Sequence, residues 1–189
     1  MSDPLQVSAF IIAKDEAHRI GATIDSLAGL VDEIVVVDSG STDGTQELCE
    51  ARGAKVIHND WPGYGPQKRF AEDQCRHDWL LNLDADEVLS PEIIEAIRTA
   101  FASSPDADGY TFAIRDCLPG EARPRRFAHT TKAVRLYDRR KGRYVDSLVH
   151  DRVKFSSSDP EIKLLPGLVW HYSVVSFGQF VDKLNKYST

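Results

Sequence analysis

The sequence predicts one α/β domain built on a largely parallel sheet with helices on both faces. Two observations indicate this fold class. Short apolar runs alternate with amphipathic stretches through the first ninety residues, and three of these runs end on acidic residues. A length of 189 residues with 42% hydrophobic content suits a single domain, spanning 1–189, around one sizeable core.

The first half holds strands and helices in strict alternation. The expected strands, each short and apolar, are Val7 to Ala13, Glu33 to Asp38, Lys55 to His58 and Trp79 to Leu83. The expected helices, each with apolar residues at helical spacing, are 20–31, Thr45 to Arg52 ended by Gly53, and Gln67 to Arg76. This alternation is typical of βα units around a buried sheet.

The second half departs from that repetition. Ser90 and Pro91 supply an N-cap and a first-turn proline for a helix. Strands are expected at Gly109 to Arg115 and at Lys132 to Tyr137, with no convincing helix between them. Leu164 to Tyr172 reads as partly extended, and a last helix is expected from Phe177 to Tyr187.

Composition excludes several classes of protein. No run resembles a secretory signal or approaches the roughly 20 apolar residues of a membrane span, so we expect a cytoplasmic, soluble chain. Three widely spaced cysteines, Cys49, Cys75 and Cys117, predict reduced thiols rather than a disulfide framework or zinc site. A net charge of −6 argues against nucleic-acid binding. Residues 115–154 nevertheless carry twelve Lys/Arg against five Asp/Glu, which would suit an anionic acceptor, peripheral contact with the inner membrane, or a solvated basic face.

Acidic residues follow three of the predicted strands. Lys14, Asp15 and Glu16 come after the first, Asp38 ends the second, and Asp84-Ala85-Asp86-Glu87 follows the fourth. Because ligands bind at the carboxyl ends of parallel strands, these residues are the first candidates for a site.

Asp84 and Asp86 are candidate metal ligands. Carboxylates two residues apart converge only if the chain bends after Leu83. Converged, they suit Mg²⁺ or Mn²⁺, which takes one or two carboxylates together with waters and substrate phosphates. The other interpretation is an acidic loop before a helix, since a bare Asp-x-Asp is a weak motif.

Four segments together resemble a known family. They are FIIAKDE at 10–16, IVVVDSGSTDGT at 34–45, GYGPQK at 63–68 and LNLDADE at 81–87. The first, second and fourth resemble family 2 glycosyltransferases, which have the GT-A fold. The GYGPQK segment is similar to the branch that contains bacterial lipopolysaccharide core β-1,4-glucosyltransferases.

The resemblance implies a nucleotide-sugar donor site in residues 1–90. It places Asp38 against the nucleotide base, Ala13, Lys14 and Glu16 around the nucleoside, and Asp84, Ala85 and Asp86 at the metal and diphosphate. Gln67 and Lys68, near a helix start, would face a phosphate or ribose. The alternative for Asp38 is turn or helix capping, which Asp43 or Ser41 could perform equally well, although its place at the strand end favours the ligand role. The alternative for Lys68 is a solvated surface position.

The acceptor half, 91–189, carries the expected catalytic residues. By resemblance to a Val-His-Glu segment, Asp151 in Val149-His150-Asp151 is the expected general base, with His150 as its helper. Asp replaces Glu here, which shortens the side chain by one methylene. His171 resembles a late histidine that completes the metal site in some GT-A enzymes. Ordinary packing is the alternative for both histidines.

The expected activity is inverting transfer of a sugar to a glycan or glycolipid. The resemblance implies UDP-glucose as donor, lipopolysaccharide core as acceptor and Mn²⁺ or Mg²⁺ as cofactor. Similar enzymes continue beyond the equivalent of Thr189, so the acceptor half is expected to be incomplete. Two alternatives stay open: a non-catalytic sugar-nucleotide-binding domain, and a haloacid-dehalogenase-like phosphatase, whose acidic motif normally lies on the first strand.

Overall fold

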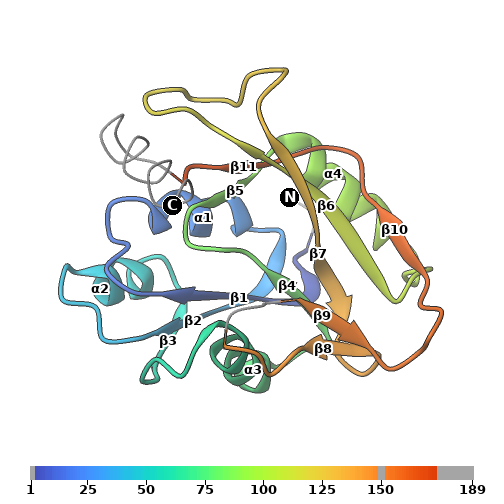
Figure 1. The fold of residues 1–189 in the computed structure, drawn as a ribbon, viewed down its shortest axis with the longest axis horizontal. Helices are drawn as coiled ribbons and strands as arrows, with labels where there is room; N and C mark the ends of the chain where they lie inside the picture. The colour runs from blue at the N-terminus through green and yellow to red at the C-terminus, as the bar shows by residue number, and fades with distance from the viewer. Residues whose placement is uncertain (1–2, 149–151, 174–189) are drawn as a thin grey trace, which may run out of the picture.

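A computed structural model describes residues 3–148 and 152–173 of the chain. Figure 1 shows a large mixed sheet whose strands run in the order β3-β2-β1-β4-β7-β6-β11-β5, with β10 beside β6. These strands are β1 (Leu5–Ala13), β2 (Val31–Asp38), β3 (Lys55–His58), β4 (Trp79–Asn82), β5 (Glu87–Leu89), β6 (Gly109–Asp116), β7 (Thr130–Asp138), β10 (Ile162–Leu164) and β11 (Val169–His171). A separate pair joins β8 (Gly142–Tyr144) to β9 (Val153–Phe155).

Strand direction divides the sheet into two regions. β3, β2, β1 and β4 are all parallel, as the βα alternation predicts. β7 then runs antiparallel to both β4 and β6, and β11 returns parallel to β6. No helix separates β6 from β7 along the chain, which confirms the expected change of pattern after the fourth strand.

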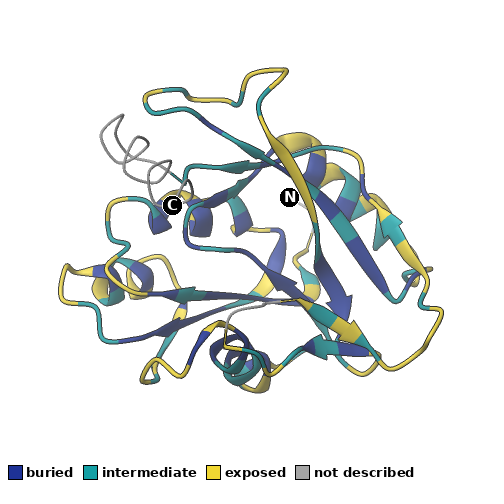
Figure 2. Cartoon of the chain, viewed as in Figure 1, coloured by how far each residue is buried: buried dark blue, intermediate teal, exposed yellow. Residues whose placement is uncertain are grey.

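Helices cover both faces of the sheet. They are α1 (Ile20–Leu27), α2 (Thr45–Glu50), α3 (Tyr64–Gln74) and α4 (Pro91–Ala100). One apolar cluster packs α1, α2 and α4 against the face that carries Ile11 and Leu81, whereas α3 covers Phe10 and Leu80 on the other face. Neighbouring strand residues thus point into opposite cores, which is why these strands read as continuously apolar. Figure 2 shows the buried residues concentrated in β1, β2 and β4.

Several boundaries differ from the sequence prediction. Val31 opens β2 rather than closing the first helix, because the chain turns at Gly29 with a φ of 69°. The third helix begins at Tyr64, three residues before the expected Gln67. The predicted cap is confirmed, since Ser90 Oγ accepts a hydrogen bond from the Ile93 amide at 3.4 Å. The expected helix at 177–187 lies outside the described residues.

The short strand β5 begins at the end of the acidic motif, where the sequence was also compatible with a loop. The chain turns after Asp84, whose amide donates to Glu87 Oε2 at 3.0 Å, and then enters β5. Thr23 of α1 donates to the carbonyl of Ala85 at 2.9 Å, and the Ala85 side chain is buried in the core. The turn that holds the two aspartates is therefore fixed from both sides.

A β-bulge lies in β7 at Arg135. Leu136 pairs with Tyr110 and Val134 with Thr111, so Arg135 is the extra residue. A bulge re-aims side chains, and this one turns a buried arginine toward the end of β4.

The described helices include none that is long and apolar enough to span a bilayer.

Candidate functional site

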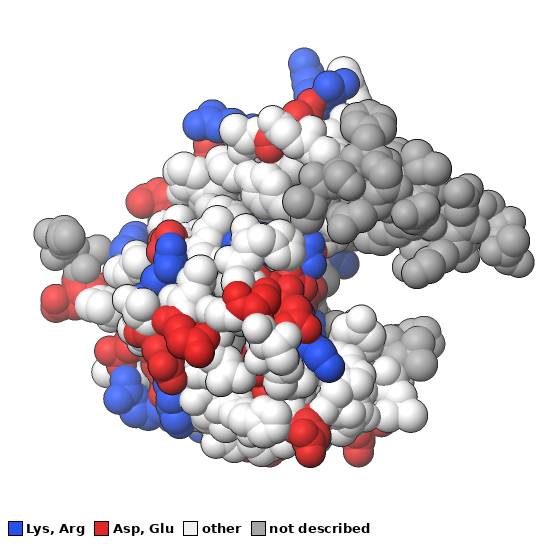
Figure 3. Space-filling view, turned by 90° about the vertical axis from the view of Figure 1, so that its left-hand side faces the viewer, with Lys and Arg blue, Asp and Glu red and all other residues white. Residues whose placement is uncertain are grey.

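The carboxyl ends of β1, β2 and β4 meet at one edge of the sheet, as the parallel order requires. Figure 3 looks onto this side of the molecule and shows acidic side chains gathered near its middle. Two loops are joined here: the Asp15 amide donates to Ser41 Oγ at 2.8 Å, and the Thr42 amide donates to Asp15 Oδ1 at 2.8 Å. The predicted juxtaposition of the first two strand ends is confirmed.

Asp84 is held between two cations. Lys68 Nζ lies 3.0 Å from its Oδ1, and Arg135 donates to its Oδ2 at 2.9 Å. Burial opposes ionisation of this carboxyl, but the charges of Arg135 and Lys68 outweigh it and lower the pKa of Asp84 below its usual range. Asp84 is therefore a fixed carboxylate.

A buried polar network extends behind Asp84. Arg135 also bonds Glu87 and donates to Asn82 Oδ1 at 2.9 Å, and the same Asn82 oxygen accepts from the Tyr144 hydroxyl at 2.7 Å. Burial raises the pKa of Glu87 to about 6, with Arg135 opposing and Asp84 reinforcing that rise. The network ties the end of β4 to β7 and β8, and so orients Asp84.

Asp86 faces a different set of partners. Its Oδ2 lies 3.3 Å from Arg19 NH1 and 3.5 Å from His171 Nε2. The other ring nitrogen of His171, Nδ1, lies 2.7 Å from Asp116 Oδ1. Burial opposes the charge on His171, but hydrogen bonds to Asp86 and Asp116 raise its pKa to about 9. The pKa of Asp86 is lowered: burial opposes the shift, and His171 and Arg19 outweigh it.

Asp86 and His171 fit a divalent cation as a pair of ligands. One oxygen and one nitrogen face each other, and Asp116 orients the ring as second carboxylates do in histidine-metal sites. Within the described residues no three His, Cys, Asp or Glu side chains form a complete cage. Mg²⁺ and Mn²⁺ do not require one, because waters and substrate phosphates complete their coordination. The metal assignment of Asp84, Asp86 and His171 stays a prediction.

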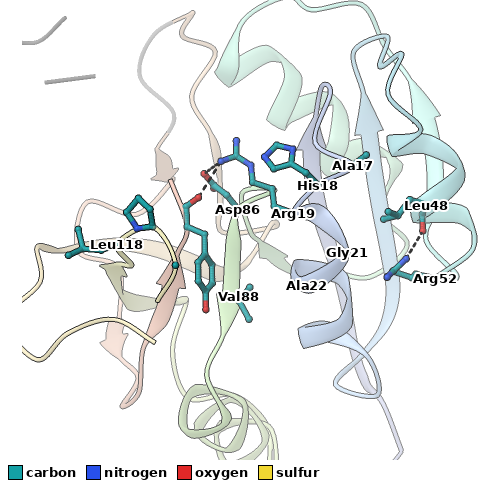
Figure 4. Close-up of a pocket in the computed structure, with 13 residues that line it drawn as sticks. Ala17, His18, Arg19, Gly21, Ala22, Leu48, Arg52, Asp86, Val88 and Leu118 are labelled. Atoms are coloured by element: carbon teal, nitrogen blue, oxygen red, sulfur yellow. Dashed lines mark hydrogen bonds and ion pairs between the residues drawn. The ribbon is translucent and has the colours of Figure 1, made fainter. Parts of the chain in front are cut away.

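Two hollows adjoin the acidic turn, and a third lies at the end of β1. Asp84, Arg135, His171 and Arg152 line one of about 490 Å³, here called the Arg135 pocket. Asp86 lines a second of about 440 Å³, the Arg19 pocket, together with α1 and residues 118–120. Figure 4 shows Arg19 reaching from the start of α1 to Asp86 beside this pocket. The two aspartates therefore line different hollows.

The third hollow contains the predicted nucleoside residues. Ala13, Lys14 and Glu16 line a pocket of about 360 Å³ with Ile12, Trp61 and Tyr64, here called the Trp61 pocket. The structure thus brings the three predicted residues together at the end of β1. Their contact with a nucleoside stays a prediction.

Asp38 is buried and bonded within its own turn. Its Oδ1 accepts hydrogen bonds from the amides of Gly40 and Ser41, both at 2.9 Å, and from Gln46 Nε2 at 2.6 Å. The turn-capping role that the sequence allowed is therefore present. Contact with a base stays a prediction.

Gln67 and Lys68 are both buried, so the solvated-surface interpretation of Lys68 is wrong. Lys68 serves the Asp84 ion pair and stacks over the Tyr144 ring at 5.0 Å. Gln67 donates to Ser39 Oγ at 2.9 Å and accepts from Asn59 at 2.6 Å. Both side chains organise strand-end loops; a phosphate or ribose contact stays a prediction.

Asp151, the predicted base, and His150, its predicted helper, lie outside the described residues. Arg152, the next residue, lines the Arg135 pocket beside Asp84 and His171.

The basic segment is partly neutralised by ion pairs, several of them with acidic residues outside 115–154. Arg143 binds Glu72 and Asp73, Arg140 binds Asp138, and Arg135 binds Asp84 and Glu87. The +7 charge of 115–154 thus overstates the free positive charge of this face.

Sequence reasoning missed several residues of this edge: Arg19, Trp61, Tyr64, Asp116, Tyr144 and Arg152. It treated Arg135 only as one of the cations of the basic segment 115–154. An arginine inside the apolar run 133–137 was the available signal, because a buried cation requires a carboxylate partner. Asp116 ends β6 and carried the same strand-end signal as Asp38.

Comparison with known proteins shows the family. The model for glycosyl transferase family 2 matches residues 8–157. An uncharacterized glycosyltransferase of Rickettsia felis is 42% identical, over 97% of this chain and 68% of its own length. Lipopolysaccharide core biosynthesis glycosyltransferase LpsC of Rhizobium meliloti is 34% identical, over 100% of this chain and 71% of its own. The chain spans about two thirds of the length of the Rickettsia relatives.

Structural comparison agrees with the sequence match. The crystal structure of mannosyl-3-phosphoglycerate synthase from Rubrobacter xylanophilus aligns with a TM-score of 0.51 at 28% identity. The match covers 59% of this chain and 41% of that protein. The GT-A fold expected from the strand-end motifs is confirmed, and the acidic turn follows the fourth strand, unlike the first-strand motif of haloacid-dehalogenase phosphatases. With the family model matching residues 8–157 and a relative 42% identical over 97% of this chain, the chain belongs to glycosyltransferase family 2.

Proposed function

We propose that the protein is an inverting, metal-dependent glycosyltransferase that moves a sugar, with glucose expected, from a UDP-sugar to a glycan or glycolipid. The observation that carries this proposal is the Asp86 and His171 pair, whose facing oxygen and nitrogen lie 3.5 Å apart beside the ion-paired Asp84. Membership of family 2 supports transferase chemistry at this edge.

On the donor side, the chain supplies ligands already held in place. Asp86 and His171 would hold Mn²⁺ or Mg²⁺, with Asp116 fixing the ring so that Nε2 points toward the site. The bound ion would stabilise negative charge on the departing diphosphate. Metal binding would displace the proton that the neighbouring carboxylates hold on His171.

Asp84 contributes through its fixed orientation. Lys68 and Arg135 hold both carboxylate oxygens, so little reorganisation is required when a donor binds. Asp84 lines the Arg135 pocket and Asp86 lines the Arg19 pocket. We therefore infer that the donor diphosphate lies over the turn that joins the two aspartates, between the two pockets.

On the acceptor side, Asp151 is proposed as the general base that removes a proton from the attacking hydroxyl, with His150 as its helper. Its chain neighbour Arg152 lines the Arg135 pocket, which supports that placement. The acceptor is proposed to be a lipopolysaccharide core sugar, the substrate class in the name of the LpsC relative. Peripheral contact with the inner membrane is part of the same proposal.

The metal-site experiment is calorimetric titration of UDP with and without Mn²⁺ into the wild type and Asp86→Asn. We expect Mn²⁺ to strengthen UDP binding to the wild type and to have no such effect on the variant. Asp159→Ala, in the exposed turn at 156–160, is the matched control and should bind as the wild type does. Unchanged Mn²⁺ dependence in Asp86→Asn would remove the metal assignment.

A non-catalytic sugar-nucleotide-binding domain is the second candidate, because the donor geometry alone requires no base. Asp151→Asn separates the two. We expect donor affinity near that of the wild type and no transfer to a lipopolysaccharide core acceptor. Full turnover in this variant would place the base elsewhere, whereas a wild-type chain that binds donor and never transfers would favour the binding domain.

A further inference from the structure

The connection between β6 and β7 projects beyond the rest of the sheet, and Figure 1 shows it at the upper end of the molecule. Residues 122–128 of this connection, here called the hairpin tip, contain three arginines and no acidic residue. Phe127 in the hairpin tip is 91% exposed, more than any other large apolar side chain of the described residues. A single exposed ring is ordinary on a protein surface, so the significance of Phe127 depends on what surrounds it.

The positive charge around Phe127 is only partly neutralised. Arg125 lies 2.5 Å from Glu121, in an exposed pair that contributes little energy. The guanidinium of Arg126 lies 5.6 Å from the centre of the Phe127 ring, and no carboxylate of the described residues forms an ion pair with it. With three arginines and one glutamate, residues 121–128 carry a net charge of +2. Figure 3 shows basic side chains at this end of the molecule.

The backbone of the hairpin tip is held in place. The Ala128 amide donates to the Arg125 carbonyl at 3.0 Å, which closes a turn that contains Phe127. The Tyr172 hydroxyl donates to the Ala122 carbonyl at 2.9 Å and so ties the tip to the chain beyond β11. An exposed ring on an anchored turn loses little conformational freedom on binding, which favours contact with a partner.

The base of the same connection lies against the acidic edge of the sheet. Residues 118–120 line the Arg19 pocket together with Asp86 and Tyr172. In Figure 4, Leu118 lies on the side of this pocket away from α1. The Tyr172 amide donates to the Asp86 carbonyl at 2.9 Å, so a single residue is bonded both to the acidic turn and to the hairpin tip. A surface bound by the hairpin tip would therefore lie beside the proposed site.

We propose that the hairpin tip is the surface through which the protein contacts an anionic membrane, with Phe127 inserted among the lipid headgroups and Arg125 and Arg126 bound to lipid phosphates. The negative surface potential of such a membrane attracts basic side chains, and the ring adds apolar burial that charge alone does not supply. The proposal rests on the proposed function, because a glycolipid acceptor would reach the Arg19 pocket from the membrane that the tip contacts. A net charge of −6 for the whole chain disfavours nucleic acid as the anionic partner.

The test is sedimentation with sucrose-loaded vesicles of phosphatidylcholine, alone or in equal parts with phosphatidylglycerol, at millimolar lipid and low ionic strength. The wild type should bind the anionic vesicles and not the neutral ones, and added salt should weaken the binding. Phe127→Ala should lower the partition coefficient about fivefold to tenfold, and Phe127→Trp should restore it. The double variant Arg125→Gln/Arg126→Gln should lower it about tenfold or more. Every variant should keep wild-type binding of UDP with Mn²⁺.

Leu164→Ala and Arg76→Gln are the matched controls, because they remove an exposed apolar side chain and an exposed cation outside the hairpin tip. Both should bind anionic vesicles as the wild type does. A wild type that does not bind anionic vesicles would overturn the proposal, as would Phe127→Ala and the double arginine variant binding them as tightly as the wild type. Either result would leave the proposed sugar transfer standing.

Two further outcomes separate the alternatives. Loss of self-association in Phe127→Ala, measured by sedimentation velocity, with unchanged vesicle binding would overturn the proposal, because the ring would then serve contact with a second copy of the chain. A wild type that binds vesicles through the hairpin tip and does not bind UDP with Mn²⁺ would support the membrane surface and remove the proposed function.

Discussion

The ammonium group of Lys68 lies 3.0 Å from Oδ1 of Asp84, and the same lysine is fully buried beneath the Tyr144 ring. A buried ammonium is costly unless it is paired, so this lysine depends on Asp84 for its charge. Asp84 depends on it in turn, because Lys68 and Arg135 each hold one of its oxygens. The acidic motif is therefore also part of the packed structure between α3 and β4.

The first prediction concerns this pair. Lys68→Met should lower the free energy of unfolding by about 2–3 kcal/mol, less than for a fully buried pair because Asp84 is 37% exposed. Urea denaturation measures the change. Lys163→Met, which breaks the exposed pair with Asp106, should change stability by less than about 0.5 kcal/mol. Equal effects of the two substitutions would contradict the structural role of Lys68.

The second prediction concerns the support of His171 by Asp116. Asp116→Asn should weaken Mn²⁺-dependent UDP binding by about 10- to 100-fold, because the ring loses the carboxylate that orients it. Calorimetry at several Mn²⁺ concentrations measures this, and metal-free UDP binding should not change. His129→Gln, which removes the other, exposed histidine near Asp116, should leave the metal dependence intact.

Strand-end positions were predictable from the sequence, because a parallel sheet brings the carboxyl ends of its strands to one edge regardless of the conformation of the loops. Lys14, Asp38 and Asp84 were placed at this edge on that principle. The Arg135 partner of Asp84 was not predictable, and His171 was assigned to the metal site only by resemblance, because these residues come from β7 and β11, more than 50 and 80 residues away along the chain. Their approach depends on the mixed half of the sheet, whose pairing no local pattern indicates.

The start of a helix was also difficult to predict from the sequence. The third helix was expected to begin at Gln67, yet α3 begins at Tyr64. The glycines are required there by close packing: the 63–65 segment lies against residues 145–148, and an added Cβ at Gly65 would lie 2.2 Å from the Val145 carbonyl oxygen. Such long-range contact leaves no trace in local propensity.

The third prediction concerns the thiols. Burial, reinforced by nearby acidic residues, raises the pKa of Cys49 to about 11 and that of Cys75 to about 12. Since the thiolate is the reactive form, both should resist a thiol reagent at pH 8 until urea unfolds the chain. Equal rates of modification in the folded and unfolded chains would contradict their burial.

The raised pKa values of Cys49 and Cys75 also make the free energy of unfolding depend on pH. A folded pKa above the unfolded value of about 8.5 stabilises the fold below that pH, and the contribution is lost as pH rises toward the folded value. Cys75→Ala should therefore lose stability less steeply than the wild type between about pH 8.5 and pH 11. Urea midpoints measured across this range provide the comparison, and parallel curves would exclude a contribution from Cys75.

The fourth prediction separates steric clash from backbone strain at two glycines. In Gly65→Ala the new methyl group would meet the Val145 carbonyl oxygen at 2.2 Å and Ser147 backbone atoms at 2.6 and 2.7 Å, so residues 145–148 must shift. Gly44 instead has a φ of 90° and nothing within 4 Å of an added Cβ, so Gly44→Ala should cost only about 1–2 kcal/mol of strain. We expect Gly65→Ala to lower the free energy of unfolding, measured by urea denaturation, by more than Gly44→Ala does.

Gly65→Ala should also slow sugar transfer, because residues 145–148 precede Arg152, which lines the Arg135 pocket. Gly44→Ala should not slow transfer. Equal losses of stability and of transfer rate in the two variants would show that the 63–65 contact does not constrain the site.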